Sequence, residues 1–196
     1  MGLVNFVQSV CAQGTETFTN MPVGATPSSY VTKNWTGDGS ISWTSTDTRG
    51  DQSITGLAAG FRNSTLTSGN LSGGIGNLSF KYKYIFSGSN ASLTVRVNGN
   101  VVGTVSVPTT QTTAATATIS NINISGVFVL SVQQTVSGER VAIDDIAWTA
   151  YSGSSCTPPT TQTSSATVSG VTSNSMNISW TNGSGTNSLV VVKAGS

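Results

Sequence analysis

The chain has 196 residues, a formal net charge of +1, 8% charged residues and no histidine. The lack of histidine excludes histidine-based catalytic triads and metal clusters, and the near-zero net charge argues against a dedicated nucleic-acid binder. No apolar stretch approaches the roughly 18 residues that a membrane-spanning helix needs. Abundant Thr, Ser, Val and Gly, with few Leu, Glu or Lys, predict an all-β chain.

Residues 1–12 (MGLVNFVQSVCA) are interpreted as the remnant of a secretory signal peptide. A weak apolar stretch ends at Val10-Cys11-Ala12, which offers small residues at positions −3 and −1 of a signal-peptidase site. The basic region that normally precedes such a stretch is absent from the sequence, so an ordinary N-terminal strand is the alternative. We expect cleavage after Ala12 and a protein that is secreted, extracellular or displayed on the cell surface.

Residues 13–151 show the pattern of an antiparallel β-sandwich, in which strand segments and turns alternate at a spacing of about 8–12 residues. The clearest segment is 78–86 (LSFKYKYIF), where aromatic residues alternate with Lys81 and Lys83. Asn98-Gly99 predicts a tight hairpin, and the polar stretch 46–53 is predicted to be a loop. Strands are predicted at 15–19, 30–33, 40–45, 57–62, 65–71, 78–86, 92–97, 101–107, 115–124, 127–136 and 140–151.

A second pattern follows a Ser/Thr/Pro linker at residues 152–164. Within residues 165–196, strands are predicted at 166–171, 175–181 and 188–193, with Trp180 in the core. This stretch resembles the start of a fibronectin type III domain. The resemblance implies a truncated β-sandwich of that kind and further domains downstream in the same protein.

The first domain also carries a resemblance. Residues 140–146 (RVAIDDI), residues 16–18 (ETF) and residues 75–83 (IGNLSFKYK) resemble MAM-like and related jelly-roll modules of secreted bacterial multidomain proteins, which include carbohydrate-binding modules. The resemblance covers about residues 14–151. It implies an antiparallel jelly-roll β-sandwich that is not itself catalytic and that lies beside enzymatic or adhesive domains.

A structural calcium site is the first candidate site. Because the first and last strands of a jelly roll lie close together, Glu16 is expected near Asp144 or Asp145. Neighbouring carboxylates repel unless a cation joins them, and Ca²⁺ binds six to eight oxygen ligands. Similar modules hold calcium with a Glu near the start and an Asp in the closing strand, so we predict Ca²⁺ at Glu16, Asp144 and Asp145. In the alternative, the two aspartates face solvent or pair with Arg140.

A basic sheet face is the second candidate site. Strand alternation places Lys81, Lys83 and Arg96 opposite the apolar faces of their strands, and Gln133 joins them if these strands are neighbours. Such a face suits an anionic or uronic polysaccharide, since Arg and Lys bind carboxylate or sulfate groups. The alternative is an ordinary solvated sheet whose lysines prevent aggregation.

Aromatic side chains provide the third candidate site. Trp35, beside a glycine-rich turn, and Tyr30 are predicted to be exposed platforms on which sugar rings stack. Trp43 and Trp148, which lie within predicted strands, are assigned to the core. Arg49, in the polar loop 46–53, is predicted to border the ligand site.

These features predict a non-catalytic carbohydrate-binding accessory module of a larger secreted protein. It would bind polysaccharide or cell-surface glycan and raise the effective concentration of that ligand for downstream domains. The alternative is a structural or adhesive spacer without a ligand. An enzyme is disfavoured because only Glu16, Asp51, Asp144 and Asp145 remain as candidate acids and bases, and their spacing suggests no hydrolase pair.

Overall fold

The computed structural model describes residues 13–151 and 161–184, which belong to two compact units. In the second unit, β12 (Ser164–Ser169) and β13 (Asn177–Thr181) pair as an antiparallel hairpin. No helix within the described ranges is long and apolar enough to cross a membrane. The predicted signal remnant 1–12, most of the linker 152–164 and the predicted strand 188–193 lie outside the described residues.

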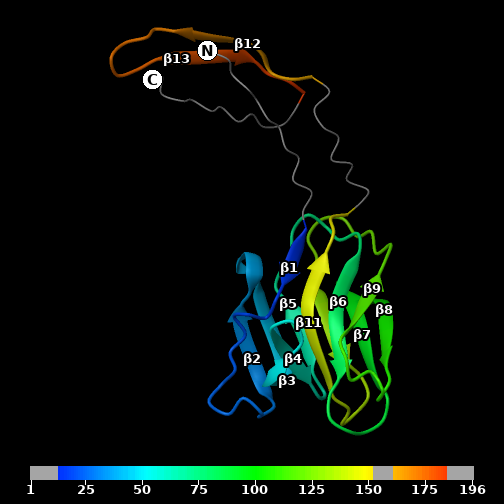
Figure 1. Ribbon diagram of the computed structural model, residues 1–196. Helices are drawn as coiled ribbons and strands as arrows, with labels where there is room; N and C mark the ends of the chain where they lie inside the picture. The colour runs from blue at the N-terminus through cyan, green and yellow to red at the C-terminus, as the bar shows by residue number, and fades with distance from the viewer. Residues whose placement is uncertain (1–12, 152–160, 185–196) are drawn as a thin grey trace. The chain divides into compact units, whose positions relative to one another are not determined.

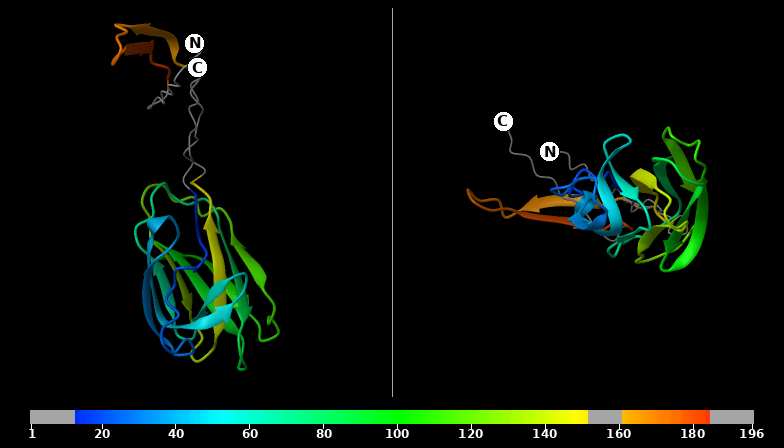
Figure 2. Two further views of the ribbon diagram at one scale, coloured as in Figure 1. Left: turned by 60° about the vertical axis from the view of Figure 1, so that its left-hand side comes forward. Right: turned by 90° about the horizontal axis from the view of Figure 1, so that it is seen from below.

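The first unit is an antiparallel jelly-roll β-sandwich, which confirms the predicted fold class (Figures 1 and 2). We call its two layers sheet I and sheet II. Sheet I contains, in spatial order, β2 (Val31–Thr36), the first part of β3 (Ser42–Ser53), β5 (Thr65–Ser68), β10 (Leu130–Gln134), β7 (Ala91–Val97) and β8 (Asn100–Val107). Sheet II contains the second part of β3, β4 (Leu57–Phe61), β11 (Val141–Trp148), β6 (Leu78–Tyr84) and β9 (Ala115–Ile119), with β1 (Gly14–Glu16) on β11.

Aromatic side chains from both sheets fill the core. Trp43 is 1% exposed and stacks on Trp35 with 6.4 Å between ring centroids, and Trp148 meets Phe128 edge-on. The core assignment of Trp43 and Trp148 is confirmed. The prediction of Trp35 as an exposed platform is wrong, because β2 continues past it and strand alternation turns its side chain inward.

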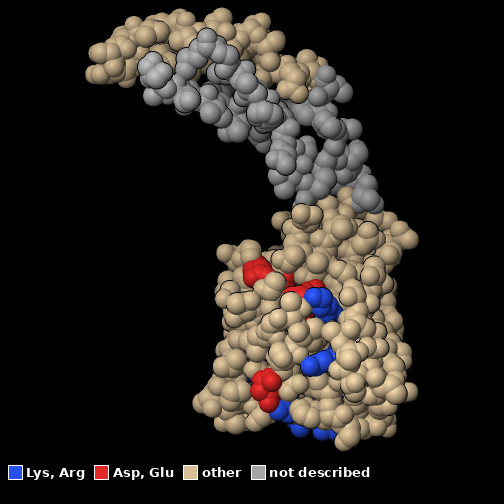
Figure 3. Space-filling model, in the orientation of Figure 1, with Lys and Arg blue, Asp and Glu red and all other residues tan. Residues whose placement is uncertain are grey.

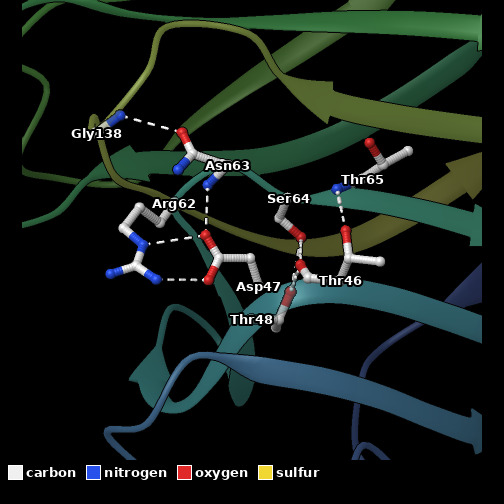
Figure 4. Close-up of polar contacts among 8 residues, drawn as sticks. All are labelled: Thr46, Asp47, Thr48, Arg62, Asn63, Ser64, Thr65 and Gly138. Atoms are coloured by element: carbon white, nitrogen blue, oxygen red, sulfur yellow. Dashed lines mark hydrogen bonds and ion pairs between the residues drawn. The ribbon is translucent and has the colours of Figure 1, made fainter.

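The long strand β3 joins the two sheets. Its residues before Asp47 pair with β5, and those after Asp47 pair with β4. The stretch 46–53, predicted to be a loop, is therefore the second part of a strand. The hydroxyls of Ser45, Thr48 and Ser64 are buried at the bend and hydrogen-bond one another, as Figure 4 shows in part. The polar composition of this stretch indicated a solvated loop, whereas several of its hydroxyls are buried in the structure.

Asp47 forms the bend itself. Its φ of 44° lies in the left-handed region, which Asp adopts more readily than most residues. Its carboxylate accepts hydrogen bonds from Arg62 Nε at 3.0 Å, Arg62 Nη2 at 2.7 Å and the Asn63 backbone N–H at 3.0 Å (Figure 4). Asn63 Oδ1 in turn accepts from the Gly138 N–H. One carboxylate thus fixes β3, the β4–β5 turn and the loop before β11.

We expect Asp47→Ala to lower the free energy of unfolding by about 2 kcal/mol, because it removes three hydrogen bonds and places Ala at a positive φ. Asp47→Asn keeps the backbone preference and one acceptor, so it should cost about half as much. Denaturant unfolding followed by tryptophan fluorescence measures both. Asp51→Ala is the control, because it removes a partly exposed ion pair but neither a backbone hydrogen bond to another strand nor a residue at positive φ; it should cost about 1 kcal/mol. An equal loss in Asp47→Ala and Asp51→Ala would contradict this role of the bend.

Candidate functional site

The predicted basic face does not form, because its residues lie on different sheets. Lys81 and Lys83 are on β6 in sheet II, whereas Arg96 on β7 and Gln133 on β10 are in sheet I. The chain crosses from one sheet to the other between β6 and β7. The alternation of polar and apolar residues predicts which face of a strand a side chain occupies, but not which sheet the strand joins. The structure does bring Arg96 and Gln133 together, with Arg96 Nη1 donating to Gln133 Oε1 at 2.9 Å.

A different cluster assembles at one end of the outer face of sheet II. The Arg49 guanidinium lies 5.3 Å from the ring centroid of Tyr30 and 4.6 Å from that of Phe86. Arg62 lies 4.4 Å from the Tyr30 centroid, and Arg140 lies 5.6 Å from the Phe86 centroid. These distances fall in the range of cation–π attraction. With one neighbouring lysine they form what we call the basic–aromatic patch: Tyr30, Arg49, Arg62, Lys83, Phe86 and Arg140.

Strand register places Lys83 beside this cluster. Arg49 is opposite Gly60, Gly60 is opposite Ala142, and Ala142 is opposite Lys83. A Cβ at Gly60 would lie 2.6 Å from Arg49 Cγ, so the missing side chain lets the Arg49 stem cross the strand towards Phe86. Arg49 and Lys83 therefore lie at the two ends of one row across β3, β4, β11 and β6, and the residues between them are the small Gly60 and Ala142.

The patch carries an excess of positive charge. Arg49 pairs with Asp51 and lowers the pKa of that carboxyl to about 2, and Arg62 likewise lowers the pKa of Asp47. In the part of the chain that the structure describes, neither Lys83 nor Arg140 forms an ion pair. Figure 3 shows this face, where acidic and basic side chains lie together along one band and the surrounding surface is uncharged.

Phe86 is the exposed aromatic of the patch. Its side chain is 51% exposed and its φ is 69°, a backbone conformation that bulky residues rarely adopt. The sequence pattern placed Phe86 on the inward face with Phe80 and Tyr84, which is wrong because β6 ends at Tyr84. Ser87-Gly88 is the turn signal that marks this end.

Sequence reasoning missed Arg62, Phe86 and Arg140 as parts of a site. It selected Tyr30 and Arg49, which the fold brings into contact, although Tyr30 is half-buried between two guanidiniums and is not an open platform. No local motif joins these residues, since they come from five separate segments. The binding roles of Lys83, Tyr30, Arg49, Arg96 and Gln133 remain predictions.

Lys81 has a different set of contacts from Lys83. Its Nζ lies 2.8 Å from Asp145 Oδ2 and donates to Thr55 Oγ1 at 2.6 Å. Asp144, which is fully buried, accepts from the backbone N–H groups of Thr55 at 3.0 Å, Gly56 at 3.2 Å and Asp145 at 2.8 Å. Together these groups hold the β3–β4 hairpin against the outer face of β11 and β6.

Glu16 is also fully buried. Its carboxylate accepts from Phe18 N at 2.9 Å, Trp35 Nε1 at 3.2 Å and Asp38 N at 3.1 Å. Burial raises the pKa of this carboxyl, although the three N–H donors act in the opposite direction. These donors join β1, β2 and the short 3₁₀ turn η1 (Asp38–Ser40).

The three carboxylates predicted to bind calcium do not fit that ion in this arrangement. β1 does pair with β11, and Glu16 lies opposite Ile146. However, Glu16 and Asp144 are bound to N–H donors and Asp145 to Lys81, whereas Ca²⁺ needs converging oxygen ligands. Among the described residues no three His, Cys, Asp or Glu side chains gather in a group that could hold a metal ion.

No protein-family model and no curated protein sequence matches the chain. Solved structures of similar fold include a family 35 carbohydrate-binding module from Clostridium thermocellum, at 18% identity over 54% of this chain and 90% of that one, with a TM-score of 0.42. A CBM36-1 domain of a multidomain xylanase from the hindgut metagenome of Trinervitermes trinervoides is 14% identical over 70% and 96%, with a TM-score of 0.42. A CBM36 module in complex with calcium and xylotriose is 17% identical over 48% and 80%, with a TM-score of 0.39.

We expect neither added calcium nor EDTA to change the melting temperature, because N–H donors and Lys81 already occupy the three carboxylates. Differential scanning calorimetry of the full chain tests this. Glu16→Gln should lower stability by about 2 kcal/mol in both conditions, since its amide would turn a donor towards an N–H group. A fall in melting temperature with EDTA that calcium restores would show that the carboxylates rearrange around an ion.

Stability should fall as the pH is lowered below about 4, where carboxyl groups of ordinary pKa become protonated in the unfolded chain. The folded pKa values of Asp47 and Asp51 are depressed by their arginine partners, so their contribution is present above that pH and is lost below it. Urea unfolding at a series of pH values measures the effect. The deficit of Asp47→Asn relative to the unmodified chain should shrink with falling pH, and a constant deficit would contradict the ion pair's contribution.

Proposed function

We propose that the sandwich is a non-catalytic glycan-binding module that holds acidic polysaccharides on the basic–aromatic patch. The ring of Phe86, which is 51% exposed and lies within 6 Å of the Arg49 and Arg140 guanidiniums, carries this proposal. The C–H face of a sugar ring packs on an aromatic ring, and a uronate carboxylate or a sulfate group accepts hydrogen bonds from Arg and Lys. Arg140 and Lys83, which form no ion pair among the described residues, supply those donors.

The row from Arg49 to Lys83 suits a chain of sugars better than a single sugar. It crosses four strands, and neighbouring strands lie about 4.8 Å apart, so the row is about 14 Å long. Phe86 follows the strand that carries Lys83. Gly60 and Ala142, in the middle of the row, are buried beneath neighbouring side chains. We therefore propose that an extended polysaccharide passes over them and contacts Phe86, Lys83 and Arg140.

The carboxylates of the patch favour binding over hydrolysis. Hydrogen bonds from Arg62, Arg49 and Tyr84 lower the pKa values of Asp47, Asp51 and Glu139 respectively. Glycoside hydrolysis usually needs a protonated carboxylic acid opposite a second carboxylate, which these three groups do not provide. We therefore propose an accessory role, in which a secreted module of residues 13–151 raises the local concentration of glycan for downstream domains.

In this proposal the second unit is the start of a fibronectin type III-like domain, joined by the linker 152–164. Its described hairpin of β12 and β13 has the antiparallel pairing that such a domain requires. A structural or adhesive spacer is the second candidate function. It is favoured by the two ion pairs inside the patch, Arg49–Asp51 and Arg62–Asp47, which stabilise the fold without any ligand.

Affinity electrophoresis of the full chain in gels containing polygalacturonate, alginate or sulfated dextran tests the proposal. We expect retardation by at least one acidic glycan, weakened by salt because the ligand contacts are ionic. Phe86→Ala, Lys83→Ala and Arg140→Ala should each weaken binding about tenfold, which corresponds to about 1.4 kcal/mol.

Arg96→Ala is the matched control, since it removes a cation from the opposite sheet and should leave the retardation unchanged. Lack of retardation by every acidic glycan would favour the spacer. Equal losses in Arg96→Ala and Lys83→Ala would show that binding follows total charge and not the patch.

A further inference from the structure

The outer face of sheet I is chemically unlike the patch. One row of outward side chains crosses five strands in register. Asn34 is opposite Thr44, Thr44 is opposite Thr67, Thr67 is opposite Ser131, and Ser131 is opposite Arg96. Each of these side chains alternates with buried neighbours on its strand and is exposed or half-exposed.

A parallel row crosses four strands beside it. Thr65 is opposite Gln133, Gln133 is opposite Thr94, and Thr94 is opposite Thr104. We call the two rows together the hydroxyl face, because all but one of their members carry a hydroxyl or an amide. Strands are about 4.8 Å apart and same-side residues along a strand are about 6.7 Å apart. The face is therefore a regular array of hydrogen-bonding groups about 19 Å wide.

The charge of this face separates it from an ordinary solvated sheet. Exposed sheet faces usually carry Lys and Glu, which maintain solubility and prevent aggregation. In the two rows the charged residue is Arg96, and its guanidinium is bound to the Gln133 amide. An anionic ligand would find one cation here, and an apolar partner would bury hydroxyls without hydrogen bonds, which is costly.

Many of these hydroxyls are available to a ligand. Thr44 donates to Asn34 Oδ1 at 2.8 Å and Arg96 bonds Gln133. Within the described residues, the hydroxyls of Thr67, Ser131 and Thr94 have no protein partner and are partly exposed. A ligand that is uncharged and rich in hydroxyls can hydrogen-bond to them directly.

We infer that the hydroxyl face is a second binding surface, and that its ligand is an uncharged, extended polysaccharide. Sheets I and II are opposite layers of the sandwich, so the hydroxyl face and the basic–aromatic patch point in opposite directions. Both surfaces can be occupied at once. If the proposed function of the patch also holds, one molecule bridges a neutral polysaccharide and an acidic one.

Sedimentation of the full chain with microcrystalline cellulose, chitin or insoluble xylan tests the second surface. We expect binding to at least one of them, little affected by salt because the ligand is uncharged. The double variant Thr67→Val/Ser131→Ala removes two central hydroxyls with little change in shape and should weaken binding about tenfold. Lys83→Ala and Phe86→Ala should leave it unchanged.

Thr116→Val is the matched control, because Thr116 is an exposed threonine on β9 in sheet II. Its melting temperature and that of the double variant show that both remain folded. Three results would overturn the inference: no binding to any of the three polysaccharides, an equal loss in Thr116→Val, or a dimer in light scattering that the double variant abolishes. The dimer would identify a second copy of the chain as the occupant.

These results are distinguishable from failure of the patch. Retardation by acidic glycans should be unchanged in the Thr67→Val/Ser131→Ala variant and weakened about tenfold in each patch variant. Bridging itself is measured by whether soluble polygalacturonate sediments with the neutral polysaccharide only when protein is added. Sedimentation of polygalacturonate that Lys83→Ala fails to reduce would overturn bridging through the patch.

Discussion

The bend of β3 at Asp47 is the constraint on which the rest of the sandwich depends. A single strand can serve two sheets only if its backbone turns sharply and its polar groups stay satisfied inside. Asp47 meets the first requirement with a left-handed φ, and the hydroxyls of Ser45, Thr48 and Ser64 meet the second. The same bend carries the chain into sheet II, where Arg49 projects from the outer face. The same bend at Asp47 therefore both joins the two sheets and positions Arg49 in the candidate site.

The scarce charged groups divide into those that hold the fold and those that remain for a ligand. Glu16 and Asp144 are buried and each binds three N–H donors, so these two carboxylates fasten loops to strands. Lys81 is likewise engaged by Asp145 and Thr55. These assignments leave a positive excess on one face of the sandwich and an almost uncharged array on the other. Two faces of different chemistry follow from where a few charges are placed.

Much of the fold could be predicted because strand alternation and turn residues are local signals. The strand that contains Lys81 and Lys83, the hairpin at Asn98-Gly99 and the buried positions of Trp43 and Trp148 all follow from patterns a few residues long. The errors arose where a local pattern was ambiguous. The glycines after Trp35 indicated a loop there. The polar residues at the bend of β3 also indicated a loop, because the sequence does not show that the hydroxyls of Ser45, Thr48 and Ser64 are buried and hydrogen-bond one another.

The sequence by itself determined the all-β class, the positions of most strands and the direction of most side chains within them, because these depend on a period of two residues. It misplaced Trp35 and Phe86, where the end of a strand was predicted two or three residues from its true position. Only the tertiary structure decided which sheet each strand joins. That choice separated Lys83 from Arg96 and brought Arg49, Phe86 and Arg140 together from distant segments. The physical reason is that strand pairing depends on long-range hydrogen bonding and core packing, which no short stretch of sequence encodes.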